Sequence, residues 1–275
     1  MSNLDSTIFG CAGLSSIRTG FEANRLLRTA FELGISHFDT APLYGKGYSE
    51  VLLGEFSQKV GRQNIVISSK FGLGNYPLPT IPASLALPLN FFKKKILNRN
   101  ATSANSDYSP PQLQHRTVSA HDIQSSFERS LGRLKTDYLD YYFLHEGIPA
   151  FLTDEAKEFL VTLRNEGRIN QLGLASNFYY IKQLPPPDVK IFDVLQYEAS
   201  ASPSGLKMQF PNLRHFGHTI LKDFKKQEFP VQIKDHEKAG YLISQALDSP
   251  TFEKVLFSTR RIGRLKENID AIKKY

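Results

Sequence analysis

Residues 35–70 read ISHFDTAPLYGKGYSEVLLGEFSQKVGRQNIVISSK, and this stretch decides the expected fold. ISHFDTA (35–41) predicts a strand, and NIVISSK (64–70), which is β-branched at its centre, predicts another. Between them, Ser49 and Glu50 open an apolar-rich helix that Gly61 ends. The stretch is therefore a strand–helix–strand unit, which is the building block of a parallel sheet.

The same alternation continues along the whole chain. Further helices are expected over 21–34, 119–134, 153–166, 237–248 and 264–275. Strands are expected over 6–10, 35–41, 64–70, 137–145, 171–176, 191–197, 219–222 and 254–258, of which TILK (219–222) has the weakest pattern. Eight such units in 275 residues predict an α/β fold, a (β/α)8 TIM barrel. A doubly wound open sheet is the alternative, but it normally carries G-x-G-x-x-G after its first strand, whereas residues 10–16 read GCAGLSS.

Composition excludes several other classes of protein. The chain is 41% hydrophobic and 22% charged, which excludes a disordered or fibrous protein and allows one or two domains. The single cysteine, Cys11, excludes an intrachain disulfide framework and a cysteine-rich zinc site. The formal net charge of +7 suggests nucleic-acid binding, but no zinc finger, RNA-binding motif or basic low-complexity tail is present. We therefore expect no nucleic-acid partner.

The sequence has no recognisable targeting or membrane segment. Its first residues, MSNLDSTIFGCAGLSS, lack a basic segment followed by an apolar run, and no stretch approaches the roughly 18 apolar residues of a membrane helix. We expect a cytoplasmic protein without a membrane partner.

One region breaks the alternation. Residues 72–118 show no periodic pattern and contain NYPLPTIPASLALP (75–88), a basic patch from Lys93 to Lys95 with Arg99, and a polar run. Because this long loop follows the third expected strand, it belongs to the catalytic face of a barrel, and a substrate lid is one interpretation. A flexible insertion is the other.

Polar side chains follow the expected strands where the apolar runs end. They are Asp39, Lys70, His145, Ser176, Asn177, Gln196 and Ser258, with Tyr44 just beyond Asp39. In a barrel such strand ends converge on one site, which in this chain would draw on residues from one end of the sequence to the other. We therefore expect a single domain over 1–275.

Tyrosine, lysine, aspartate and histidine can together act as a general acid. A free tyrosine has a pKa of about 10, and a nearby cation favours its ionised form. A carboxylate would hold that lysine charged and in place, and a neutral histidine could donate a hydrogen bond to a carbonyl oxygen. Hydride that arrives at a carbonyl carbon creates an oxygen that needs such a proton donor.

Blocks of this sequence resemble the aldo-keto reductases, in that family's order. The blocks are FDTAPLYGKGYSEVLLGEF (38–56), SSK (68–70), FERSLGRLKTDYLDYYFLH (127–145), GLASN (173–177), LQY (195–197) and FSTRRIGRLKENIDA (257–271). The resemblance runs from about residue 7 to the C-terminus, apart from 72–118 and 199–235. It implies a barrel that binds a nicotinamide cofactor without a dinucleotide-binding fold.

The resemblance also implies a role for each matching residue. Tyr44 resembles the proton donor, Lys70 the cation that assists it, Asp39 the carboxylate that pairs with the lysine, and His145 the imidazole that orients the substrate. Ser176, Asn177 and Gln196 resemble the groups that hold the nicotinamide carboxamide. The adenosine-phosphate segment is matched by Ser258, Thr259, Arg260, Arg264, Glu267 and Asn268.

The arginines of the C-terminal segment favour NADP over NAD. Arg260, Arg261 and Arg264 lie around the start of the last expected helix, where an anion is favoured, and arginine binds phosphate bidentately. This arrangement suits a 2′-phosphate. The alternative interpretation is a basic helix end that contacts only solvent. The segment 199–235 lacks the family's Pro-Leu-Gly-rich stretch and the start reads GCAG, so the residues that hold the pyrophosphate and stack on the nicotinamide stay unassigned.

The sequence thus predicts an NADPH-dependent oxidoreductase that reduces an aldehyde or ketone, or oxidises the alcohol, as a monomer or weak homo-oligomer. A cofactor-binding barrel that senses redox state and binds a partner protein is the alternative. No metal is expected, since His115, His121, His215, His218 and His236 lack metal-ligand spacing.

Overall fold

Eight short apolar segments pair edge to edge in chain order and close into a parallel barrel, which confirms the expected architecture. The computed structural model describes residues 4–74, 76–89, 116–199, 204–222 and 224–275. The strands are β1 (Thr7–Gly10), β2 (His37–Asp39), β3 (Val66–Phe71), β4 (Leu139–His145), β5 (Ile169–Ala175), β6 (Val194–Glu198), β7 (Arg214–His218) and β8 (Lys254–Phe257). The barrel closes where β1 pairs with β8, in the register Ile8 to Leu256.

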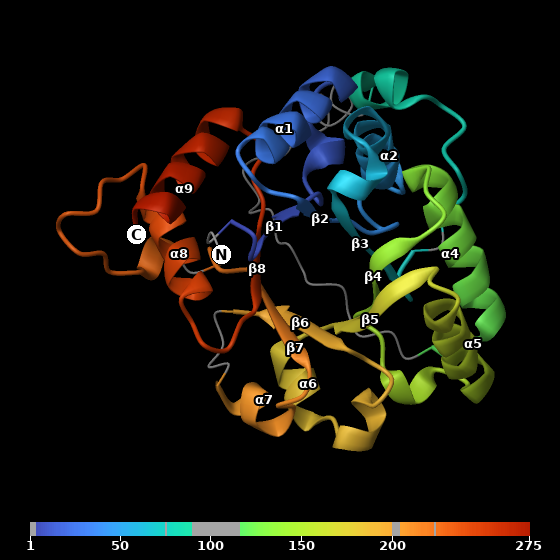
Figure 1. Ribbon diagram of the computed structural model, residues 1–275. Coiled ribbons are helices and arrows are strands. Elements are labelled where there is room, and N and C mark those ends of the chain that lie inside the picture. The colour runs from blue at the N-terminus through green and yellow to red at the C-terminus, as the bar shows by residue number, and fades with distance from the viewer. Residues whose placement is uncertain (1–3, 75, 90–115, 200–203, 223) are drawn as a thin grey trace, which may run out of the picture.

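Helices surround the strands, as Figure 1 shows. They are α1 (Gly20–Glu32), α2 (Tyr48–Val60), α4 (Ala120–Leu134), α5 (Asp154–Asn165), α6 (Phe178–Gln183), α7 (Ser204–Gln209), α8 (Lys238–Leu247) and α9 (Ile262–Lys274). None of the helices in these described ranges is long and apolar enough to cross a membrane.

Local sequence signals set the ends of several helices. Thr19 caps α1 by accepting a hydrogen bond from the Glu22 backbone N–H. The same helix ends at Gly34, whose φ of +107° suits glycine, and the N–H of Ile35 bonds back to the Ala30 carbonyl. The helix expected over 21–34 is thus confirmed, and its two ends are set by neighbouring residues alone.

The expected seventh strand at 219–222 is wrong. The strand is Arg214–His218, and residues 220–222 form a turn. Its sequence, RHFGH, looks too polar for a buried strand, but His215 is fully buried with both ring nitrogens engaged. The Tyr197 hydroxyl lies 2.9 Å from Nδ1, and the Phe210 carbonyl oxygen lies 3.0 Å from Nε2. These partners hold the imidazole in the core and leave neither nitrogen for a metal.

The region after β3 also departs from expectation, since residues 83–89 form a helix where no periodic pattern was recognised. Pro82 precedes the first turn, where its missing N–H costs nothing, and Ala83 and Leu87 are buried at helical spacing. The rest of the proposed lid, with the basic patch from Lys93 to Lys95 and Arg99, falls in 90–115, outside the described residues.

Two apolar layers hold the barrel together. Inside it, Ile8, Tyr141, Phe143 and Phe216 pack against one another across the sheet. Outside it, the larger core fills the space between the strands and the helices. In that outer layer α2 approaches α4 closely at Gly54, where an added Cβ would lie 2.4 Å from the Arg133 carbonyl oxygen.

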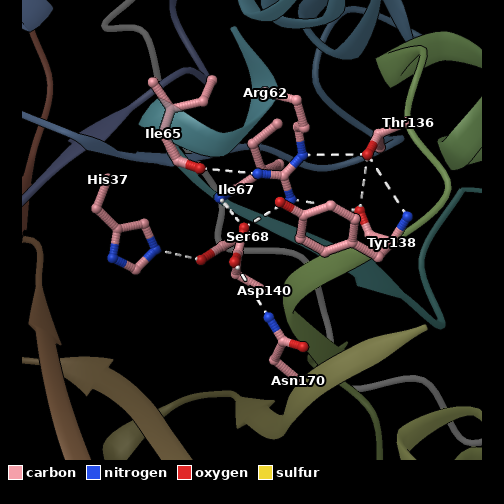
Figure 2. Close-up of polar contacts among 9 residues, drawn as sticks. All are labelled: His37, Arg62, Ile65, Ile67, Ser68, Thr136, Tyr138, Asp140 and Asn170. Carbon is pink, nitrogen blue, oxygen red and sulfur yellow. Dashed lines mark hydrogen bonds and ion pairs between the residues drawn. The ribbon is translucent and has the colours of Figure 1, made fainter. Parts of the chain in front are cut away.

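A hydrogen-bond network around Arg62 and Asp140, here called the polar clamp, links the N-terminal ends of β3 and β4 (Figure 2). One Asp140 carboxylate oxygen accepts from Arg62 at 2.6 Å and from the Ile67 backbone N–H at 2.8 Å, while the other accepts from Asn170. Arg62 also donates to the Ile65 carbonyl at 2.7 Å. The clamp lies at the end of the barrel that serves stability, so the chemistry is expected at the opposite end.

Candidate active site

The C-terminal ends of β2 to β6 bring five of the predicted residues together. Asp39 ends β2, Lys70 is the penultimate residue of β3, and His145 ends β4. Ser176 follows β5, and Gln196 lies within β6. Because these strands are consecutive neighbours in a parallel barrel, their side chains meet at one face.

Lys70 and Asp39 form a buried ion pair at the centre of this face. The lysine Nζ lies 2.5 Å from Asp39 Oδ1, and the two side chains are 2% and 3% exposed. The lysine also donates to the Thr40 carbonyl at 2.9 Å, and Gln196 Nε2 donates to the second aspartate oxygen at 3.3 Å. Both charges are thus hydrogen-bonded, which a buried pair requires.

Tyr44 lies against this pair. The lysine Nζ is 5.0 Å from the centre of the tyrosine ring, and the His145 ring meets that tyrosine edge-on at 6.0 Å. Tyr44 stands before three residues with positive φ, Gly45, Lys46 and Gly47, which turn the chain sharply into α2. The geometry therefore places the four predicted catalytic side chains beside one another.

The His145 imidazole is held neutral. Burial lowers its pKa well below the ordinary value, and the positive charge of Lys70 lowers it further. Within the described residues its Nδ1 has no hydrogen-bond partner. Since a buried polar atom is costly when unpaired, a bound molecule that hydrogen-bonds this ring would be favoured.

A second buried ion pair, which the sequence reasoning missed, supports the site from behind. Glu50 accepts from Ser69, the neighbour of Lys70, at 2.6 Å and from Arg133 Nε at 2.6 Å. Arg133 also donates to the Tyr76 carbonyl at 2.7 Å, which ties the segment after β3 to α4. A signal was present in α4, where polar Ser126, Ser130 and Arg133 recur at helical spacing among buried apolar residues.

Ser176 and Asn177 already have partners in the fold. The Ser176 hydroxyl donates to Glu146 at 3.1 Å, and Asn177 Oδ1 caps α6 by accepting from the Tyr179 backbone N–H at 2.8 Å. Glu198 accepts from the Phe178 backbone N–H at 2.7 Å. The sequence reasoning identified neither Glu146 nor Glu198, because their hydrogen bonds to Ser176 and to the Phe178 N–H, respectively, come from other strand ends.

The segment after β8 lies beside the start of the chain. An added Cβ on Gly13 would lie 3.0 Å from Arg260 Cγ, and one on Gly10 would lie 3.3 Å from Ser258 Cβ. The GCAG start therefore gives the arginine stem room to lie along the backbone. Thr259 accepts from the backbone N–H of Arg261, the N-cap residue of α9.

The remaining predicted residues of this segment divide by exposure. Arg260, Arg264 and Glu267 are exposed, whereas Asn268 is only 5% exposed. The Asn268 backbone packs tightly against Gly240 of α8. A Cβ added to Gly240 would lie 2.6 Å from the carbonyl oxygen of Asn268. The structure thus places Asn268 in the α8–α9 contact.

Cys11 lies near the proposed site, behind Asp39. Cys11 is fully buried, burial raises the pKa of its thiol, and its backbone N–H donates to the Asp39 carbonyl at 2.8 Å. Cys11 is therefore part of the hydrophobic core. In the part of the chain that the structure describes, no three histidine, cysteine or carboxylate side chains gather as a metal site would require.

Curated relatives match part of the chain. An uncharacterized oxidoreductase from Bacillus subtilis is 30% identical over 167 residues, which is 60% of this chain and 44% of that protein. An NADH-specific methylglyoxal reductase from Escherichia coli is 29% identical over 150 residues, or 54% and 39%. A D-threo-aldose 1-dehydrogenase from a Pseudomonas species is 29% identical over 160 residues, or 56% and 44%. The matched stretch thus spans less than half the length of these relatives.

Solved structures share the fold over nearly the whole chain. An aldo-keto reductase from Klebsiella pneumoniae in complex with NADPH has a TM-score of 0.63 at 18% identity, with coverage of 97% of this chain and 85% of that one. The holo form of an aldo-keto reductase from Bacillus halodurans has a TM-score of 0.63 at 20% identity, with coverage of 98% and 86%. These likenesses establish the barrel.

Residues 9–229 match the sequence model of a family described as "Aldo/keto reductase family". That range holds most of the barrel and the cluster of Asp39, Tyr44, Lys70 and His145. The chain belongs to the aldo/keto reductase family.

Proposed function

We propose that this chain is an NADPH-dependent oxidoreductase, folded as a single domain over 1–275, that reduces an aldehyde or ketone to an alcohol or runs the reverse reaction. One observation carries the proposal: the buried Lys70–Asp39 pair lies against the Tyr44 ring, which His145 also contacts. A purely structural ion pair would not need a tyrosine and a neutral histidine at the same strand ends.

The side chains divide the chemistry among them. When bound, the nicotinamide supplies a hydride to the carbonyl carbon. Tyr44 gives its hydroxyl proton to the carbonyl oxygen as the C=O double bond becomes single, so that carbonyl, hydride and proton together yield the alcohol. The Lys70 cation stabilises the tyrosinate that is left, and Asp39 keeps that cation in place. Neutral His145 orients the same oxygen through one hydrogen bond.

The residues at hand fit a nicotinamide cofactor. Ser176, Asn177 and Gln196 lie at the adjoining ends of β5 and β6, where they would hold the carboxamide. At the other end, the cofactor's adenosine phosphate would lie against Ser258, Thr259, Arg260, Arg264 and Glu267, and the space left by Gly13 beside Arg260 supports this. Asn268 completes the proposed set through the resemblance alone, because it is buried against α8.

The choice of NADPH rests on the arginines at the start of α9. Arg260 and Arg264 are exposed there, and no side chain caps the helix N-terminus. A guanidinium beside free helix N–H groups suits a 2′-phosphate, which NADH lacks. One relative is named as NADH-specific and one solved structure holds NADPH, so this chain's own arginines carry the preference.

A substrate panel tests the proposed function. We expect the purified protein to oxidise NADPH in the presence of some aldehydes or ketones, with NADH less effective. Tight binding of NADPH with neither NADPH oxidation by any carbonyl compound nor NADP⁺ reduction by any alcohol would contradict the proposal and favour a redox sensor.

A further inference from the structure

Glu146 adds a titratable carboxyl group beside the proposed catalytic histidine. It directly follows His145, at the end of β4, and adopts a φ of +48°. For a residue other than glycine, such a conformation costs on the order of 1–3 kcal/mol and persists only where the surroundings enforce it. Here the Glu146 backbone N–H donates to the Ala175 carbonyl at 2.8 Å, which ties the strained residue to the end of β5.

The side chain of Glu146 is hydrogen-bonded to Ser176, which is proposed to hold the nicotinamide carboxamide. Its Oε2 accepts from the Ser176 hydroxyl at 3.1 Å, and the Asn177 backbone N–H also bonds to this carboxyl group. The hydroxyl hydrogen of Ser176 is thereby committed to the carboxylate, which leaves the oxygen as an acceptor. The Glu146 carboxyl group is thus one hydrogen bond away from the residue proposed to contact the carboxamide.

The charge of Glu146 changes near neutral pH. Burial raises its pKa to about 7, and the nearby carboxylate of Glu198 contributes in the same direction. Glu198 is itself fixed by the Phe178 backbone N–H. A small change in the local charge will therefore decide whether Glu146 is protonated.

The other ionisable groups at these strand ends leave Glu146 as the variable charge. Asp39 of β2 and Lys70 of β3 compensate each other in their ion pair. Burial lowers the pKa of His145 and of His218 at the end of β7, which keeps both rings neutral around pH 7.

We propose that Glu146 is a positioning residue whose carboxylate favours the oxidised over the reduced nicotinamide cofactor. The inference rests on the proposed function, which puts the carboxamide at Ser176. An oxidised nicotinamide ring is cationic and a reduced ring is neutral, so a carboxylate close by attracts only the former. The ionised residue would shift the chain toward alcohol oxidation.

The linkage has a definite sign. The cationic ring stabilises the carboxylate, so binding of the oxidised cofactor releases the Glu146 proton to solvent. Affinity for NADP⁺ therefore rises as the pH increases through about 7, while affinity for NADPH gains nothing from this group. The 2′-phosphate also titrates near pH 6, but both cofactors carry it, so its effect cancels in the ratio of the two dissociation constants.

The test is the ratio of the dissociation constants for NADP⁺ and NADPH, measured by calorimetry from about pH 6 to about pH 8. In the wild type we expect the ratio to change by about fivefold or more in favour of NADP⁺, which follows if the oxidised cofactor lowers the pKa of Glu146 by about one unit or more. Glu146→Gln keeps an acceptor for Ser176 but removes the charge, so its ratio should stay within about twofold across the same range. Glu155→Gln, an exposed carboxylate on α5, serves as the matched control and should follow the wild type.

The outcomes separate the two proposals. Equal and pH-independent ratios in the wild type and Glu146→Gln, with both cofactors bound, would overturn the role of Glu146 and leave the proposed function standing. Failure of the wild type to bind either cofactor would overturn both.

Discussion

Lys70 Nζ lies 2.5 Å from Asp39 Oδ1, and water reaches almost none of either side chain. The pair spans the ends of β2 and β3, which adjoin in the barrel, with Thr40 and Gln196 completing its hydrogen bonds. A buried ion pair of this kind adds little to the stability of the fold compared with an apolar pair of equal volume, but removal of one charge leaves the other buried and unpaired, which is strongly destabilising. Its value for this chain therefore lies in holding a cation against Tyr44.

Lys70→Met should cost about 3–5 kcal/mol in the free energy of unfolding, because it leaves the Asp39 charge buried and uncompensated. The double variant Lys70→Met/Asp39→Asn should recover a large part of that loss, since no charge is then buried. Urea denaturation measures both. The exposed control Lys190→Met should change the free energy of unfolding by less than about 1 kcal/mol. A change as small as this for Lys70→Met would show that the pair is not buried as described.

Gly54→Ala should destabilise the protein by about 1–3 kcal/mol or more, because the added Cβ would meet backbone atoms of α4 that cannot move away easily. Gly263→Ala is the matched control. It lies in α9 with nothing within 4 Å of an added Cβ, so it should stabilise by about 0.4–1 kcal/mol through the unfolded chain. Thermal unfolding distinguishes the two, and equal shifts would contradict the tight α2–α4 approach.

The stability of the protein should fall in mild acid through its buried histidines. Burial lowers the pKa of His37 well below its ordinary value, and three nearby cations lower it further. The unfolded chain therefore binds more protons than the folded chain below pH ~6.5, so this contribution is present above that pH and lost as the pH falls. Each such histidine costs about 1.4 kcal/mol per pH unit.

The variant His37→Asn isolates this effect. Urea denaturation at several pH values should give a slope smaller by about one proton than that of the wild type. The comparison with wild type is needed because Glu146, whose pKa is raised to about 7, acts in the opposite direction. Identical slopes would show that His37 is protonated in the folded state.

Arg264→Ala should weaken NADPH binding and leave NADH binding unchanged, because the guanidinium is proposed to contact only the 2′-phosphate. Charge-assisted hydrogen bonds contribute about 1.5–3 kcal/mol, so a loss of tenfold or more in affinity is expected. Lys266→Ala, an exposed cation on the same helix, is the control. Equal losses for NADPH and NADH would place the 2′-phosphate elsewhere.

The strand ends of this barrel could be predicted because the signal is local. An apolar run that stops at Asp39, Lys70 or His145 marks both the strand and the polar group after it. The tight turns and helix caps are local in the same way. The candidate site therefore emerged largely from short segments, and the barrel geometry then brings them together.

Partners distant in sequence explain what the sequence did not reveal. RHFGH was overlooked as a strand because the groups that satisfy His215 come from Tyr197 and Phe210, outside the local pattern. Arg133 and Glu50 are 83 residues apart, so neither marks the other as an ion-pair partner. A buried charge can be recognised only when its partner is known.

The central claim is that Tyr44 is the proton donor, and Tyr44→Phe tests it most directly. The measurement is single-turnover oxidation of bound NADPH by an accepted carbonyl substrate, together with the dissociation constant for NADPH in the same variant. We expect the rate to fall by a factor of about 10²–10⁴, the usual contribution of a positioned general acid, while NADPH binds as tightly as in the wild type. A rate close to that of the wild type, with binding intact, would contradict the account.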